Sequence, residues 1–335
     1  MNTLTCETVS DSKTTALTTN FHFYDHHPDS SDYIKDVVRG LLGKQKKLPC
    51  HLLYDETGSA LFEKICETKE YYVTRTETEL LKKYAPDIAR FIGADAAVFE
   101  FGSGNTRKVR LLLDQLKGRC AYLAIDISKD QLFKNAGELA ADYPHLKVVA
   151  VCADFQREEG LPLEIQNHRN KVFFFPGSTI GNLAPDEAIQ LLRKISGMVG
   201  PDGTALVGVD LKKDAAMLDM AYNDEAGFTS KFEMHALERL NDEFGANFDL
   251  DNFHYRGSYN PTKGKVEMFL VSLEAQTATL QGNTLSFRKG ERIHVEDSHK
   301  YSIDEFQEMA RNSGFKTAVT WIDRNSWFSI HLLLR

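Results

Sequence analysis

Between residues 76 and 212 the chain alternates short apolar runs with longer stretches in which apolar residues recur every three or four positions. The short runs predict buried strands, and the longer stretches predict helices. The expected helices cover 77–91, 106–116, 128–143 and 185–199, and the expected strands end at Gly102, Asp126, Asp154, Gly177 and Asp210. This alternation predicts an α/β fold, a parallel sheet with helices on both faces.

The C-terminal segment extends the sheet in a different way. A helix is expected over 303–313, and two strands over 317–323 and 327–334 are separated by a short turn. Strands this close in sequence pair antiparallel. An antiparallel hairpin that ends an otherwise parallel sheet is the pattern of class I methyltransferases, so we expect their Rossmann-like fold.

The first strand runs into Gly102-Ser103-Gly104 and then into a helical pattern. Glycines here let the backbone pass close under a ligand, although a turn without a ligand would use them equally well. Asp126 closes the next strand, where a ribose-binding carboxylate is expected. A dinucleotide fingerprint would have a third glycine in place of Arg107, which disfavours NAD and favours a cofactor without a pyrophosphate, such as S-adenosylmethionine.

The segment 212–300 interrupts the alternation. Its pattern predicts mostly helix over 212–248 and strands over 265–273, 277–288 and 292–301. An insertion of about 90 residues is too long for a loop and predicts a second structural unit. Within its last stretch, the alternation of a strand puts Glu296 and Ser298 on one face and Asp297 on the other.

These patterns divide the chain. Residues 1–20 are rich in Ser and Thr without periodicity and predict a disordered tail. Residues 76–211 and 301–335 form the expected cofactor-binding domain, and 21–75 with 212–300 form an α+β substrate-binding domain. Tyr71 and Tyr72 lie in the latter, either as a half-buried pair in a loop or with one hydroxyl toward a ligand.

The amino-acid composition limits the kinds of binding partner that we expect. The formal net charge of −8 shows no basic excess of the kind that nucleic-acid binders carry, so we expect a small-molecule substrate. The sequence has no apolar run of membrane-spanning length, and we predict a cytoplasmic protein without membrane contact, with a monomer as the expected state. The five cysteines form no C-x-x-C pair, and the three histidines of 22–27 have no converging spacing, so no metal site is predicted.

Four long motifs make the chain, from about residue 30 to 335, resemble the histidine-specific methyltransferases of ergothioneine biosynthesis. The motifs are Tyr54-Asp55-x-x-Gly58-Ser59-x-Leu61-Phe62, Glu70-Tyr71-Tyr72-x-Thr74-Arg75-Thr76-Glu77, Glu100-x-Gly102-Ser103-Gly104 and Gly177-Ser178-Thr179-Ile180-Gly181-Asn182-Leu183. The chain departs from the family at Val73, where proline is frequent, and in its longer N-terminal tail.

The resemblance implies roles for particular residues. It assigns S-adenosylmethionine to the glycine-loop residues and to side chains near the ends of the first three strands: Gly102, Ser103, Gly104, Lys108, Asp126, Asp154 and Phe155. It places the substrate's α-amino and carboxylate groups on Tyr71, Asn182 and Tyr222, with Tyr54 lining the same pocket. Glu296 and Ser298 would hydrogen-bond the imidazole, while Tyr71 and Asn182 would orient the amine for catalysis.

The resemblance also implies the reaction: three methyl transfers from S-adenosylmethionine to the α-amine of L-histidine, giving the betaine hercynine. Two alternatives stay open. One keeps the chemistry but acts on another amino acid, such as a tryptophan derivative, and the other is a module that binds S-adenosylmethionine without catalysis.

Overall fold

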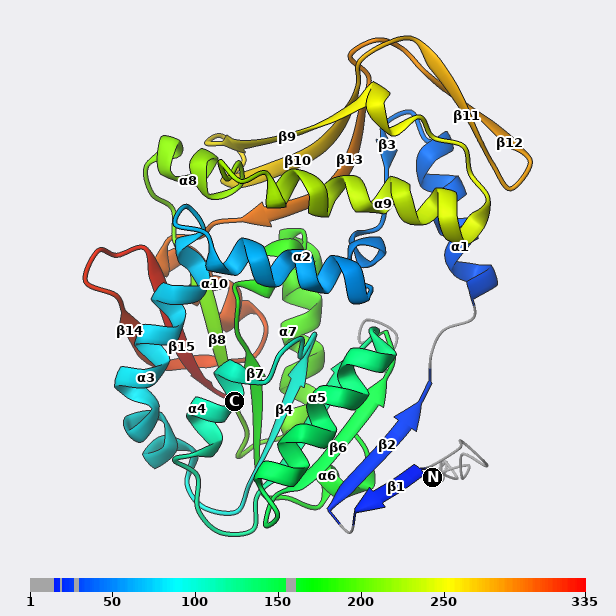
Figure 1. Ribbon diagram of the computed structural model, residues 1–335. Coiled ribbons are helices and arrows are strands. Elements are labelled where there is room, and N and C mark those ends of the chain that lie inside the picture. The colour runs from blue at the N-terminus through cyan, green and yellow to red at the C-terminus, as the bar shows by residue number, and fades with distance from the viewer. Residues whose placement is uncertain (1–14, 19, 27–29, 155–160) are drawn as a thin grey trace, which may run out of the picture.

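The computed structural model of the protein describes residues 15–18, 20–26, 30–154 and 161–335. Within these ranges the chain forms two units, one built on a nine-stranded sheet and one on a four-stranded sheet (Figure 1). In spatial order the larger sheet contains β1 (Thr15–Thr18), β2 (Phe21–Asp25), β6 (Lys147–Cys152), β5 (Ala121–Asp126), β4 (Ala96–Phe101), β7 (Asn170–Phe175), β8 (Thr204–Asp210), β15 (Phe328–Leu334) and β14 (Lys316–Ile322).

The larger sheet has the expected class I topology. Strands β6, β5, β4, β7 and β8 run parallel, whereas β15 is antiparallel to both β8 and β14. The C-terminal hairpin is thus part of the sheet, with its second strand between β8 and β14. The predicted fold class is confirmed.

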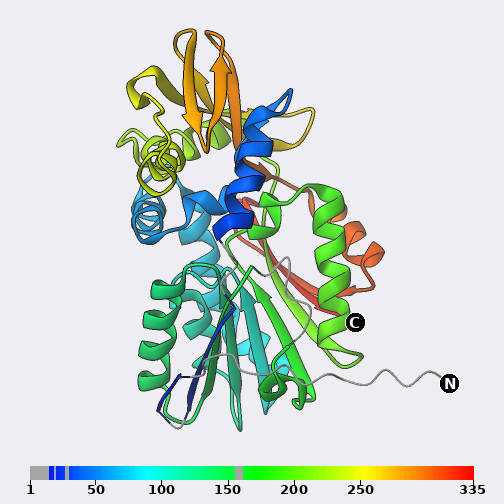
Figure 2. The ribbon, with the colours of Figure 1, turned by 90° about the vertical axis from the view of Figure 1, so that its right-hand side faces the viewer.

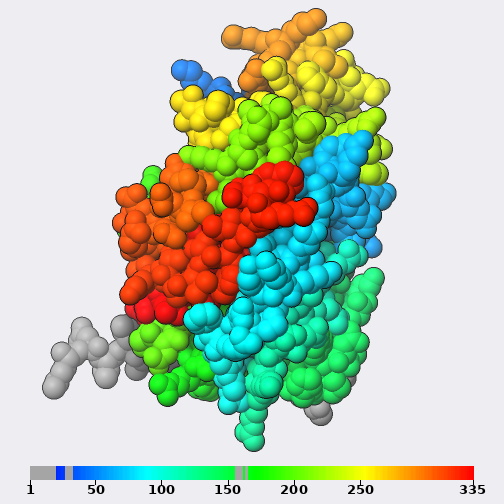
Figure 3. Space-filling model, turned by 90° about the vertical axis from the view of Figure 1, so that its left-hand side faces the viewer, coloured from blue at the N-terminus to red at the C-terminus, as the bar shows by residue number. Residues whose placement is uncertain are grey.

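Helices cover both faces of this sheet (Figure 2). Alternate residues of each strand point to opposite faces, and accordingly Val98 and Phe99 of β4 belong to different hydrophobic clusters. One face packs against α3 (Tyr72–Ile92), α4 (Arg107–Leu113) and α5 (Lys129–Asp142), and the other against α6 (Leu163–Gln166), α7 (Pro185–Val199) and α10 (Ile303–Asn312). In Figure 3 the C-terminal hairpin (red) lies against α3 (cyan), where the Trp321 and Tyr84 rings are 5.9 Å apart.

Two strands near the N-terminus, which the sequence pattern did not reveal, join the larger sheet. β1 lies within the range predicted as a disordered tail, and β2 lies within the range assigned to the substrate-binding domain, yet both extend the larger sheet beside β6. Phe21 and Phe23 alternate with polar residues, and both pack on Phe133 of α5. Because the neighbouring strand β6 lies more than a hundred residues away, the local pattern alone did not reveal this pairing. The remainder of the predicted tail, 1–14 and 19, lies outside the described residues.

The second unit is a small mixed sheet packed on helices. Its strands in spatial order are β3 (Lys46–Lys47), β13 (Arg292–His299), β10 (Lys265–Ser272) and β9 (Phe253–Asn260). Below this sheet, α9 and α2 run side by side (Figure 1). The helical elements of the unit are α1 (Ser30–Leu42), η1 (Cys50–Leu53), α2 (Glu56–Glu67), α8 (Ala215–Ala221), α9 (Phe228–Phe244) and η3 (Leu250–Asn252).

Three elements differ from what the sequence pattern suggested. The stretch 277–288 is not one strand but a hairpin of β11 (Gln276–Leu280) and β12 (Asn283–Phe287), turned by Gln281 and Gly282, which both have positive φ. β9 was missed because, of its residues, only Phe253 is buried. Helix α3 begins at Tyr72, so the tyrosine pair stands at a helix start instead of in a loop.

The two units meet where the short helix η2 (Thr179–Asn182), which follows β7, lies against the end of β13. The His299 ring bonds to the Gly181 carbonyl oxygen through Nδ1 at 2.9 Å. A Cβ at Gly181 would lie 2.6 Å from the His299 carbonyl oxygen, so only glycine permits this approach. The contact fixes Asn182 beside β13.

Substituting Gly181 by alanine should therefore loosen the joint between the units. We expect Gly181→Ala to lower the free energy of unfolding by about 1–3 kcal/mol, because backbone on both sides must shift to admit the methyl group. Gly197→Ala is the matched control, since a Cβ there meets no atom within 4 Å inside helix α7. Urea denaturation of both variants measures the difference, and equal stability would contradict the proposed close contact.

Candidate active site

The glycine loop follows β4 and bonds to the end of β5. Gly102 and Gly104 have φ of +66° and +46°, values that favour glycine. The Gly104 N–H donates to one oxygen of the Asp126 carboxylate at 3.1 Å, and the Ser128 N–H donates to the other at 2.9 Å. A Cβ at Gly102 would touch nothing within 4 Å, so open space lies beside the loop, as a bound cofactor requires.

Lys108 links this loop to the end of β7, the strand beside β4 in the sheet. Its ammonium is 2.5 Å from the carboxylate of Glu77, a buried residue of α3. The same carboxylate accepts the Gly177 N–H at 2.8 Å, after β7. Lys108 is thus held at the carboxyl edge of the sheet by an acid that we did not predict. Ser103 is buried in the loop itself.

The other predicted cofactor residues follow β6. Asp154 is partly buried two residues beyond the end of that strand, on the same edge of the sheet as Asp126. Phe155 lies outside the described residues. The predicted contacts of these two residues with the cofactor therefore stay a prediction.

Polar side chains predicted to bind the substrate come together from separate elements. The Asn182 amide, at the end of η2, donates to Glu296 Oε1 at 2.8 Å. Tyr222, just after α8, shares a hydrogen bond of 2.8 Å with the Ser298 hydroxyl. Glu296 and Ser298 are both buried on one side of β13, whereas Asp297 bonds to Lys265 and His294 on the other, as the strand alternation predicted.

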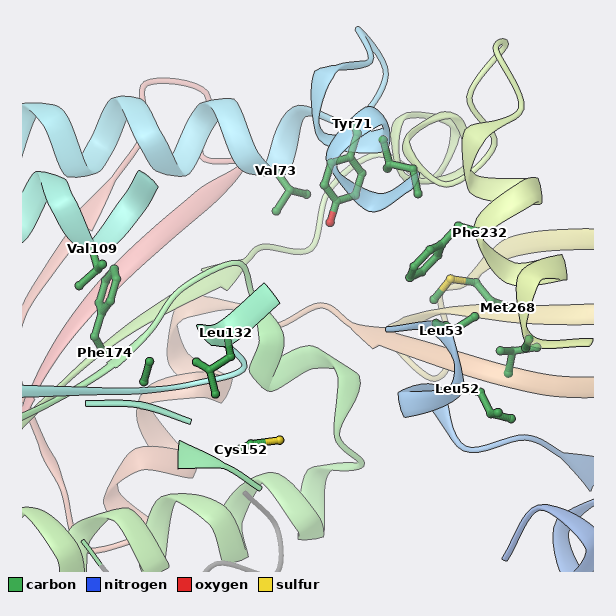
Figure 4. Packing of buried hydrophobic residues seen from close by; sticks show 14 of the residues in the cluster. Leu52, Leu53, Tyr71, Val73, Val109, Leu132, Cys152, Phe174, Phe232 and Met268 are labelled. Atoms are coloured by element: carbon green, nitrogen blue, oxygen red, sulfur yellow. The ribbon is translucent and has the colours of Figure 1, made fainter. Parts of the chain in front are cut away.

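An aromatic wall closes this group. The Tyr71 ring packs edge-on against Tyr222 at 5.9 Å between centroids, and its hydroxyl points away from its own helix in Figure 4. Phe62 lies between Tyr71 and Phe232, and Tyr54 packs on Phe232 at 5.4 Å. On the right of the view, Phe232, Met268 and Leu53 gather from the second unit (Figure 4).

Tyr54 also ties the wall to the glycine-loop edge. Its backbone carbonyl accepts the Ser128 hydroxyl at 2.6 Å, two residues after Asp126. The predicted substrate residues and cofactor residues therefore lie on adjoining surfaces.

A buried ion-pair network supports this group of side chains, and the sequence interpretation missed it. The Lys300 ammonium donates to Ser298 at 2.8 Å, to Tyr222 at 2.6 Å and to Asp210 at 2.7 Å. Asp210 ends β8 and also accepts the Tyr72 hydroxyl at 2.8 Å. Continuing the alternation from Glu296 and Ser298 to Lys300 would have pointed to this residue.

Charge pairing sets the protonation of this network. Burial by itself would raise the pKa of the Asp210 carboxyl, but the ammonium groups of Lys300 and Lys213 lower it below its usual range. Burial likewise disfavours a charged Lys300, but Asp210 outweighs it and raises the pKa of the ammonium. Both groups therefore stay charged at neutral pH.

Glu296 behaves differently. Burial raises the pKa of its carboxyl to about 8, with Asp297 adding to the rise and Lys300 opposing it. The Asn182 amide donates to one of its oxygens but brings no charge. Glu296 therefore holds a proton through much of the neutral range in the free protein.

This raised pKa predicts a pH-dependent stability. Because the folded protein holds the Glu296 proton more tightly than the unfolded chain, the stabilisation is complete below the ordinary pKa of 4.5 and is lost as pH rises toward about 8. Glu296→Gln is the reference because its side chain cannot titrate. In protein without ligand, the Tm of wild type minus the Tm of Glu296→Gln should decrease between about pH 5 and about pH 8. A difference in Tm that does not change with pH would show that the Glu296 carboxyl has an ordinary pKa in the folded protein.

Within the described residues, no helix is long and apolar enough to cross a membrane, and no three His, Cys, Asp or Glu side chains are grouped to hold a metal ion. The ligand groups gathered at the sheet edge are instead hydroxyls, amides, carboxyls and backbone N–H groups. Such groups suit organic molecules with several polar positions.

Three relatives are similar to this chain over most of its length. The Histidine N-alpha-methyltransferase of Mycolicibacterium smegmatis is 33% identical, over 90% of this chain and 94% of that protein. The Ergothioneine biosynthesis protein 1 of Neurospora crassa is 31% identical over 87% of this chain, which corresponds to 33% of that longer protein. The 4-dimethylallyltryptophan N-methyltransferase of Claviceps purpurea is 25% identical over 90% of this chain and 96% of that protein.

The family comparison covers nearly the whole chain. Residues 33–335 match the family described as histidine-specific methyltransferase, SAM-dependent, where SAM is S-adenosylmethionine. The match spans both units, and it includes all four motifs on which the predicted resemblance rested. The chain therefore belongs to the histidine-specific, S-adenosylmethionine-dependent methyltransferases.

Proposed function

We propose that the protein transfers methyl groups from S-adenosylmethionine to the α-amino nitrogen of L-histidine, three times in succession, to form the betaine hercynine. The observation that carries this proposal is the pairing of buried Glu296 with partly buried Asn182 and of Ser298 with Tyr222, both buried. That arrangement puts groups suited to an imidazole next to groups suited to an amino acid's α-carbon substituents. Family membership and the mycobacterial relative support the same substrate.

The cofactor lies along the carboxyl edge of the larger sheet in this proposal. When bound, S-adenosylmethionine supplies an electrophilic methyl group on a sulfonium sulfur. Asp126 would accept from the ribose hydroxyls, since its carboxylate lies at the end of β5 beside the glycine loop. The remaining contacts assigned to it come from the loop, α4 and the segment after β6: Gly102, Ser103, Gly104, Lys108, Asp154 and Phe155.

The substrate ring lies against β13. An imidazole has two nitrogens, of which one donates and one accepts in the neutral form. Glu296 and Ser298 are two residues apart on one face and can address both nitrogens. A site of this kind discriminates strongly, because an analogue that leaves buried polar groups unpaired loses their hydrogen bonds without regaining water.

The chain's contribution to catalysis is alignment. Tyr71 and Asn182 orient the amine so that its lone pair points along the bond that breaks, and Tyr222 holds the carboxylate end. No covalent intermediate with the protein is needed. The amine must lose a proton before each transfer, and we assign that proton to water. After the third transfer the nitrogen carries no proton, and the reaction stops.

The alternatives differ in what they predict. The Claviceps relative acts, by its name, on a tryptophan derivative, and a related specificity here would leave at least one of Glu296 and Ser298 without a ring partner. A module that binds the cofactor without catalysis would release no S-adenosylhomocysteine with any amino acid. A small-molecule substrate fits the acidic composition. The cytoplasmic location, the monomeric state and the absence of nucleic-acid partners stay predictions, as does the division into domains.

The first experiment is substrate profiling. Purified protein is incubated with S-adenosylmethionine and an equimolar mixture of amino acids, and the products are read by mass spectrometry. We expect mono-, di- and trimethylated histidine and no other methylated amino acid. Methylation of tryptophan instead would keep the chemistry and overturn the substrate, and no methylation at all would favour the non-catalytic module.

Two substitutions should separate the two ligand sites. Asp126→Ala should weaken S-adenosylhomocysteine binding at least about tenfold, because the ribose loses its acceptor. Glu296→Ala should leave cofactor affinity unchanged and weaken histidine binding by about 1–3 kcal/mol. Calorimetry with each ligand measures both. Cofactor affinity unchanged by Asp126→Ala, or histidine affinity unchanged by Glu296→Ala, would misplace the corresponding contact.

A further inference from the structure

A second carboxyl group is buried in the same region as Glu296. Glu233 lies on α9, is 1% exposed, and directly follows Phe232 of the aromatic wall. Its Oε2 atom is fully buried and has no hydrogen-bond partner among the described residues. A buried acid oxygen without a partner costs stability unless a ligand or a proton compensates it.

Glu233 is electrostatically coupled to the proposed ring site. The nearby Glu296 charge, after burial itself, raises the pKa of the Glu233 carboxyl well above its usual range. Geometry places the two acids in one buried region, because Met268 of β10 is paired with Glu296 and lies beside Phe232, the residue before Glu233 (Figure 4).

The remaining titratable neighbours do not neutralise Glu233. Cys50 of η1, Tyr54 and Tyr255 of β9 are neutral at physiological pH, because burial raises the pKa of each. Lys300 lowers the pKa of Glu296 but is already committed to Asp210. Two acids without a matching base within a small buried space hold one proton more readily than none.

We propose that Glu233 is a specificity-determining residue of the imidazole site, and that it acts together with Glu296 on the substrate ring through one proton that the two carboxyl groups share. This inference rests on the proposed function. Glu233 contributes either an O–H donor to a neutral ring or a negative charge to a protonated one, so the site accepts both forms of the histidine side chain.

The chemistry keeps the proton count constant. A neutral ring with one proton on the acid pair is equivalent to a protonated ring between two carboxylates, because only the position of one proton differs. Free imidazole has a pKa of about 6.5, so both forms of histidine exist near neutrality. An indole ring has no basic nitrogen and offers a single N–H donor. Two acids therefore favour imidazole over indole.

The test compares two substitutions at this position. Glu233→Gln keeps an N–H donor that never titrates, and Glu233→Leu removes the polar group altogether. We expect Glu233→Leu to weaken histidine binding at least about tenfold at about pH 7. Glu233→Gln should stay within about threefold there and gain relative to wild type as rising pH removes the shared proton from the wild-type pair.

Histidine binding is measured by calorimetry on protein saturated with S-adenosylhomocysteine, from about pH 6 to about pH 9. Asp242→Asn is the matched control, an exposed acid on the same helix, and should change nothing. Cofactor affinity should be equal in all variants. Loss of histidine binding with intact cofactor binding locates the effect in the ring site.

The possible failures are distinguishable. Wild-type protein that does not bind histidine overturns the proposed function and this inference with it. If wild type binds histidine and Glu233→Leu binds it equally well, only the role of Glu233 is overturned. Should Glu233→Leu fail to fold, Glu233→Gln decides alone, since a pH profile identical to that of wild type overturns the shared proton.

Discussion

The buried ion pair between Lys300 and Asp210 is the interaction on which the site depends. Both side chains are completely buried, so each charge needs the other, and removing one partner would leave an uncompensated charge in the interior. Asp210 ends β8 of the larger sheet, while Lys300 directly follows β13 of the smaller one. The pair therefore fixes the two units relative to each other at the point where both proposed ligands meet.

Around that pair, both units supply polar side chains. Asn182 comes from the larger sheet and reaches Glu296 on the smaller one. Tyr72 begins α3 and reaches Asp210, while its neighbour Tyr71 packs on Tyr222. The left-handed conformation of Ser178, with φ of +57°, also belongs to this joint, because its hydroxyl accepts the Asp210 N–H at 3.0 Å. Strain in a non-glycine residue is tolerated where the surroundings determine the conformation.

Sequence patterns predicted the larger sheet well because each of its central strands is a continuous apolar run next to a periodic helix. They predicted the face of Glu296 and Ser298 for the same reason, since alternation is a local property. They failed where structure depends on residues distant in the sequence. β2 pairs with β6, and the role of Lys300 depends on its ion pair with Asp210. Glu233 was missed because a glutamate inside a helical pattern is ordinarily exposed, and nothing local indicates that α9 turns it inward.

The Lys300 ammonium has three N–H groups, and its three partners Asp210, Tyr222 and Ser298 account for all of them. The two hydroxyl oxygens each accept one of these hydrogens and also share one O–H···O bond with each other. Of their two hydroxyl hydrogens, one is used in that bond, so one hydrogen remains, whichever direction the bond takes. Before any ligand binds, the network therefore has one hydroxyl hydrogen left to donate. A ligand that bonds to it must present one hydrogen-bond acceptor.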